Sequence, residues 1–171
     1  LPIFDDDGCE HATVVDGNVA NDDGGGLYVL GTLDLTELEL LNNEGTLGGG
    51  AFVSGTLDGG ANAVVSGNNA TFAGGGIYNE VFFGYPEITD TEFSENGAFF
   101  GGGLYFSGSG FNQDFPPVLF SGTTFRQNQA SEGSAFYMEP MYGVFEIPDL
   151  FSFTLSDSFS GDVTLDRNQG P

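Results

Sequence analysis

The residues of this chain that could do chemistry are nearly all carboxylates: 25 Asp and Glu stand against two Lys or Arg, one His and one Cys. Glycoside hydrolysis needs two carboxyl groups about 5 to 9.5 Å apart. Asp90 and Glu92 could share one face of a strand because they are two residues apart. A lyase would also need a cationic group, and Arg126 and Arg167 lie in no recognisable motif. Acidic pairs arise by chance in such a sequence, so we predict no catalytic residues and no enzyme activity.

Candidate metal ligands gather toward the N-terminus. His11 is the single histidine, so any Ser-His-Asp or Cys-His site would depend on it alone. Cys9 and His11 offer too few ligands for zinc, and Cys9 has no second cysteine with which to form an internal disulfide. The runs Asp5 to Asp7 and Asp22-Asp23 lack the spacing of an EF-hand. We expect no metal and no cofactor, with weak Ca²⁺ binding by these runs as the alternative to solvated charge.

The net charge of -23 excludes whole classes of partner. Nucleic acid needs clustered Lys and Arg, so we expect no nucleic-acid binding, and an anionic membrane surface is disfavoured for the same reason. The sequence has no apolar run of the length that spans a membrane, which predicts no direct membrane insertion. Such a charge is best tolerated where salt or divalent cations screen it, or it simply keeps an apolar chain in solution.

A repeated unit must position all of these residues. Its clearest copy runs from Phe93 to Tyr105 and contains an apolar residue three places before an Asn, a glycine-rich triplet and an apolar-aromatic pair. The repeat asparagines of five copies are Asn18, Asn43, Asn68, Asn96 and Asn128. We expect a sixth copy to begin at Leu165 and Asn168. Self-similarity along the whole sequence is typical of solenoids.

The segments between the triplets predict strands and not helices. Ile88 to Phe93 alternates apolar and polar residues, which is the two-residue period of a half-buried strand. The 29 glycines would destabilise helices but fall at fixed positions of the repeat, where tight turns need them. We therefore predict an all-β fold, a right-handed parallel β-helix of about five to six coils. It would form a single domain over residues 1–171, processed from or part of a longer solenoid.

Two motifs of the repeat resemble a known family. Phe93-Ser-Glu-Asn96 and Phe125-Arg-Gln-Asn128, followed by glycine-rich segments such as Gly74-Gly-Gly-Ile77-Tyr78, are similar to the FxxN and GGxI repeats of the chlamydial polymorphic outer membrane proteins. They also resemble related right-handed β-helix repeat proteins of bacteria and algae. The resemblance implies a secreted or surface-displayed protein involved in adhesion. We thus expect an extracellular structural or adhesive element, and the alternative is a polysaccharide-acting, pectin-lyase-like β-helix enzyme.

Alternation along the glycine-rich strand assigns its two faces. One column is wholly apolar and should point inward, namely Leu27, Ala51, Ile77, Leu104 and Phe136. The opposite column should form an aromatic ladder on the outer surface, beside the strip of glycines, namely Tyr28, Phe52, Tyr78, Tyr105 and Tyr137. This ladder could be a platform with a shallow groove for sugar rings or another chain. The alternative is that the rings only stabilise one another or lie beneath the inserted segments.

The repeat asparagines predict a structural ladder, because stacked amides can hydrogen-bond from coil to coil at a turn. Asn69-Ala70-Thr71 is a glycosylation sequon, so Asn69 is a candidate glycan site. The apolar insertions Phe106 to Pro117 and Met138 to Leu150 should pack onto the coil or meet a partner. Terminal coils of a β-helix expose unpaired backbone groups, and no helical cap is evident in the sequence. We therefore expect end-to-end self-association or a larger surface assembly, with a glycan as a further candidate partner.

Overall fold

The computed structural model is made of short parallel β-strands joined by turns. It describes residues 12–80, 86–108 and 118–138, and the backbone of short strands at 144–146, 154–155, 159–160 and 164–166. Within these residues no helix occurs, and every strand pairing is parallel. Parallel strands need crossover connections, which here are made by the strands of the other sheets.

Four sheets share the strands. The first consists of β1 (Thr13–Asp16), β3 (Leu38–Leu41), β6 (Ala63–Ser66), β10 (Thr91–Ser94), β13 (Thr124–Arg126) and β16 (Thr154–Leu155). The second consists of β2 (Leu27–Asp34), β5 (Ala51–Asp58), β8 (Ile77–Glu80), β11 (Leu104–Ser107), β14 (Phe136–Met138) and β17 (Phe159–Ser160). The third consists of β9 (Glu87–Thr89), β12 (Val118–Ser121), β15 (Val144–Glu146) and β18 (Thr164–Asp166). The short fourth sheet consists of β4 (Glu44–Leu47) and β7 (Asn69–Ala73).

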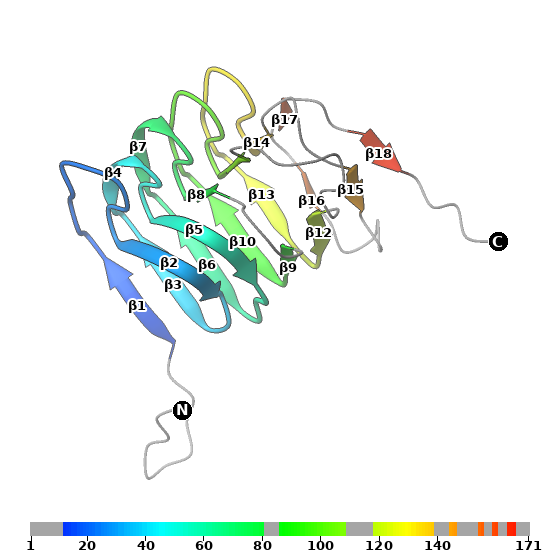
Figure 1. Cartoon of the computed structure of the whole chain (residues 1–171), viewed down its shortest axis with the longest axis horizontal. Helices are drawn as coiled ribbons and strands as arrows, with labels where there is room; N and C mark the ends of the chain where they lie inside the picture. Colours follow the sequence, from blue (N-terminus) through cyan, green and yellow to red (C-terminus); the bar gives the residue numbers. More distant parts are fainter. Residues whose placement is uncertain are drawn as a thin grey trace, which may run out of the picture.

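The chain visits these sheets in turn, and each pass adds one strand beside the strand of the previous pass. Figure 1 shows the result as a stack that advances from β1 and β2 at one end toward β16, β17 and β18 at the other. Successive repeat asparagines are bonded across 25, 25, 28 and 32 residues, so the path around the stack lengthens along the chain. The prediction of an all-β solenoid with parallel sheets is confirmed.

Alternate residues of each strand fill the interior. In β3 and β6 the burial alternates strictly, and the inward residues Leu40 and Val65 are fully buried. In the N-terminal coils the inward side chains first become smaller, from Leu27 to Ala51 and from Leu40 to Val65. From there they become larger in both long sheets, from Val65 to Phe93 and Phe125, and from Ala51 through Ile77 and Leu104 to Phe136. Phe120 of the third sheet meets Phe125 and Phe136, with ring centroids 5.7 and 5.5 Å apart. The interior therefore widens toward the C-terminal side and is filled by aromatic rings.

The first glycine of each triplet makes the corner that precedes the second sheet. Gly74, for example, has φ of 66°, a left-handed conformation that side chains other than glycine rarely adopt. The second glycine is required by proximity, since a Cβ on Gly75 would lie 2.4 Å from the carbonyl oxygen of Gly102 in the next coil. The triplet thus combines a tight turn with close backbone contact between coils.

The corner after the first sheet also uses the left-handed conformation, but only some of its residues are glycine. The column before the repeat asparagines has φ of 67° at Gly17, 54° at Asn42, 68° at Gly67, 58° at Glu95 and 57° at Gln127. Glu and Gln adopt this conformation at a cost of about 1–2 kcal/mol each. The corner is therefore imposed by the stacked coils and not by local preference.

The alignment of the sixth repeat copy is wrong. Leu165 pairs with Phe145 in the third sheet, whereas Leu155 pairs with Phe125 and continues the strand that precedes the asparagines. In agreement with this register, Phe159 pairs with Phe136 in the second sheet. Leu155 is followed three places later by Ser158 and not by Asn, so the motif that guided the alignment is absent there.

Candidate functional site

The repeat asparagines form a continuous hydrogen-bonded ladder at the corner between the first and fourth sheets. Asn68 illustrates the pattern: its Oδ1 accepts from the backbone N–H of Asn43 at 2.9 Å and from Asn43 Nδ2 at 3.0 Å. Its own Nδ2 donates to the Leu40 carbonyl at 2.8 Å and to Asn96 Oδ1 at 3.0 Å. The same bonds recur at each step of the column Asn18, Asn43, Asn68, Asn96 and Asn128. Because Asn43, Asn68, Asn96 and Asn128 are buried, their amides have no capacity for a ligand.

The aromatic column lies on the face of the second sheet opposite the core. Neighbouring rings are stacked at centroid distances of 4.9, 5.3, 5.0 and 5.1 Å, with interplanar angles between 6° and 11°, along Tyr28, Phe52, Tyr78, Tyr105 and Tyr137. The faces of the three inner rings are therefore covered by their neighbours, whereas Tyr28 and Tyr137, at the two ends of the column, each stack on one ring of the column only.

The expectation of an open aromatic platform with a groove must be corrected. Phe52 and Tyr105 retain only 7% and 6% of their accessible surface, whereas Tyr28 retains 58%. The strip of glycines beside the column forms no groove either, because Gly76 is buried and a Cβ there would lie 2.4 Å from the Gly103 carbonyl oxygen. Sequence alternation predicts which side chains lie on the outer face of the sheet. Aromatic rings that stack at the spacing of neighbouring strands nevertheless cover one another's faces and so exclude solvent from them.

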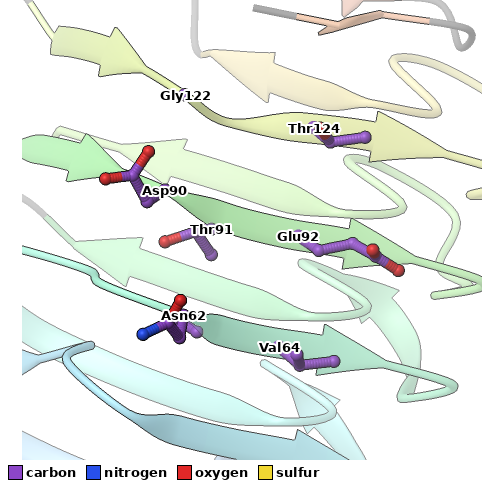
Figure 2. Close-up of a pocket in the computed structure, with 8 residues that line it drawn as sticks. Asn62, Val64, Asp90, Thr91, Glu92, Gly122 and Thr124 are labelled. Atoms are coloured by element: carbon purple, nitrogen blue, oxygen red, sulfur yellow. The ribbon is translucent and has the colours of Figure 1, made fainter. Parts of the chain in front are cut away.

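The acidic pair Asp90 and Glu92 lines a shallow hollow on the outer face of the first sheet, which we call the carboxylate hollow. It has a volume of about 370 Å³ and is lined by Asn62, Ala63, Val64, Asp90, Thr91, Glu92, Gly122 and Thr124. Figure 2 shows that the carboxylates of Asp90 and Glu92 point toward opposite ends of this hollow. They therefore do not face each other across a space for a glycosidic bond, as the two carboxyl groups of a glycosidase do.

The Glu92 carboxylate is moreover already engaged. It forms an ion pair with Arg126 and accepts a hydrogen bond from Ser94 Oγ at 2.8 Å. Both contacts are made by the same carboxylate oxygen, Glu92 Oε1. Arg126, one of the two candidate cations, is thus the partner of Glu92 in this surface pair.

Asp22 and Asp23 lie on the loop between β1 and β2. Burial raises the pKa of Asp23 above its ordinary value, the Asp22 carboxylate raises it further, and a hydrogen bond with the Leu47 backbone acts in the opposite direction. Among the described residues, no three His, Cys, Asp or Glu side chains are close enough to hold a metal ion. The remaining candidates, namely Asp5 to Asp7, Cys9, His11, Arg167 and Asn168, lie outside the described residues, as do residues 109–117 and most of 139–150 of the insertions.

Asn69, the sequon asparagine, is exposed and lines a second shallow hollow, which sequence reasoning missed and which we call the amide hollow. Its volume is about 620 Å³, and its walls are three stacked tripeptides that follow the ladder asparagines, 69–71, 97–99 and 129–131. Bridges between Asn69 and Gly97, and between Gly97 and Gln129, hold the tripeptides in register. The signal in the sequence was weak because only the middle residue of these tripeptides is repeated, as Ala, and the first and third residues differ.

None of the described residues forms a helix long and apolar enough to cross a membrane. Comparisons of the chain with protein-family models, with curated proteins and with solved structures returned no match.

Proposed function

We propose that this chain is an extracellular structural or adhesive β-solenoid, a subunit of a cell-surface or filamentous assembly, and not an enzyme. The carrying observation is the end of the stack formed by β1 and β2. In the described structure each of these strands pairs on one side only, β1 with β3 and β2 with β5. Unpaired strand edges are templates for pairing with another chain.

The side chains at this end support the proposal. Six large hydrophobic residues are exposed in the described structure. Four of them belong to this end coil, namely Val14, Val19, Tyr28 and Leu30. Leu30 keeps 74% of its accessible surface. Apolar groups concentrated around an unpaired edge are typical of an interaction surface.

The partner in this proposal is a second copy of the chain, which presents β16 and β17 at the opposite end of the same two sheets. Such a contact joins two different surfaces, so it repeats without closing and builds a filament. Several finer features belong to the same proposal: right-handed coiling, five to six coils, and one domain over residues 1–171. The six strands in each of the two long sheets support that coil number.

An adhesive role outside the cell also accords with the FxxN and GGxI repeats and with the charge. A net charge of -23 opposes association between copies unless ions screen it. The assembly should therefore form at the ionic strength of sea water or a cell wall and weaken in dilute buffer.

Sedimentation velocity and electron microscopy test the proposal on the 171-residue chain. We expect species that grow with protein concentration at high salt, and short rods in micrographs. Leu30→Lys places a charge on the exposed edge and should leave a monomer. Phe72→Lys, which alters a residue of similar character away from the end coil, is the matched control and should assemble normally.

A wild-type chain that remains monomeric at every concentration and salt would contradict the proposal. Normal assembly of Leu30→Lys, with far-UV circular dichroism equal to that of the wild type, would contradict the location of the contact at the β1 and β2 edge.

A further inference from the structure

The amide hollow is lined by uncharged polar side chains. Asn69, Thr71, Gln129 and Ser131 line it, and within the described structure none of their side-chain atoms donates or accepts a hydrogen bond. The side chain of Asn68, next to Asn69 in the sequence, makes four hydrogen bonds in contrast. Two amides and two hydroxyls are thus available to a ligand.

The backbone beneath these side chains is fixed. The N–H of Ala70 donates to Gly97 O at 2.8 Å, and the N–H of Ala98 donates to Gln129 O at 3.0 Å. A Cβ on Gly97 would lie 3.1 Å from Asn69 Oδ1, so the missing side chain leaves room for the Asn69 amide over the floor of the hollow. Asn69 and Gln129 are two strand spacings apart, about 10 Å, which accommodates more than one sugar ring.

The lining of the hollow carries no charged side chain, although the chain as a whole is strongly acidic. At its rim Phe99 exposes 51% of its surface, and the ring of Phe100 packs edge-on against it at 4.7 Å, which orients it. A neutral wall of amides and hydroxyls with one aromatic ring offers hydrogen bonds and an apolar contact together. An anionic ligand would gain no partner here and would be repelled by the surrounding carboxylates.

We propose that the amide hollow binds a neutral, extended oligosaccharide. Sugar hydroxyls hydrogen-bond to Asn69, Thr71, Gln129 and Ser131, and one pyranose ring contacts the face of Phe99. This inference adds a ligand to the adhesive role proposed above and rests on that role only for the extracellular setting. It moves the glycan site from the aromatic column, whose ring faces are covered, to a corner of the solenoid.

Isothermal titration calorimetry of the unglycosylated 171-residue chain tests the inference. The probes are cellohexaose, which is neutral and extended, and an oligogalacturonate of equal length, which is anionic. We expect saturable binding of cellohexaose only. Phe99→Ala should weaken that binding about tenfold, through loss of the ring contact. Gln129→Leu removes one hydrogen-bonding amide at similar volume and should weaken it as well.

Phe72→Ala is the matched control, since Phe72 exposes 50% of its surface and also packs edge-on against Phe100, but does not line the hollow. Its affinity should equal that of the wild type. Absence of cellohexaose binding, equal binding of the anionic probe, or equal losses in Phe72→Ala and Phe99→Ala would each overturn the inference. The titration measures affinity for a sugar, whereas sedimentation measures the mass of the assembly. The outcome for the glycan site is therefore independent of the outcome for the proposed assembly.

Discussion

Replacement of Asn68 by Ala should be among the most destabilising single changes in the chain. The side chain is 1% exposed and makes four hydrogen bonds, two as donor and two as acceptor. Truncation leaves the buried backbone N–H of Asn43 without its acceptor and leaves a gap in the ladder. A net value of about 1 kcal/mol for each of the four bonds predicts a loss of about 4 kcal/mol, to which the stranded buried donor adds about 1–3 kcal/mol.

Asn18→Ala is the internal control for this prediction. Asn18 lies at the exposed end of the ladder, and its Nδ2 donates to Asn43 Oδ1 in a part-buried bond and to the Asp16 carbonyl in an exposed one. Its loss should cost less than about 1 kcal/mol. Urea unfolding followed by far-UV circular dichroism measures both variants. If the two free energies of unfolding fall by equal amounts, the buried ladder does not stabilise the fold as argued.

Three further changes test other parts of the solenoid. Gly75→Ala places a Cβ 2.4 Å from Gly102 O and should cost about 3 kcal/mol or prevent folding, as circular dichroism would show. Glu95→Gly relieves a left-handed residue with φ of 58° and should raise the free energy of unfolding by about 1 kcal/mol, in contrast to most glycine substitutions. The pKa of Asp23 is raised in the folded state by burial and by Asp22. At a pH above this raised pKa the charged carboxylate therefore destabilises the folded state. The destabilisation disappears as the pH falls through the raised pKa, because the carboxyl group then takes up a proton. Asp23→Asn should thus raise the melting temperature at pH 7 and reduce its gain on acidification, and a variant less stable than the wild type at pH 7 would contradict this.

The strand registers could be predicted because the sequence repeats the same residue types at matching positions. Leu104 and Tyr105 occupy adjacent columns, and alternation alone indicates which of them faces the core. The corners could not be predicted where Glu37, Glu95 and Gln127 adopt the left-handed conformation, since no local preference marks those residues. There the stacked coils determine the backbone and override propensity.

The candidate site was less predictable than the fold. The exposure of Tyr105 depends on rings contributed by two other coils, and the sequence alone does not give the distances between these rings. The amide hollow was missed because its polar residues change from copy to copy, as Asn69, Gly97 and Gln129 illustrate. Repeated residues revealed the scaffold, whereas the departures from the repeat mark the surface available to a ligand.

The widening of the interior means that the copies are not interchangeable. In a solenoid of constant cross-section an internal copy can be duplicated or exchanged, since each copy meets equal neighbours on both sides. Here Val65 is followed by Phe93 in one column and Ala51 by Ile77 in another, so neighbouring coils fill the interior with side chains of different size. Exchange of two internal copies would create a void at one junction and a clash at the other. Variation in the number of coils during evolution is therefore easiest by addition at an end, and internal duplication would require compensating changes in core size.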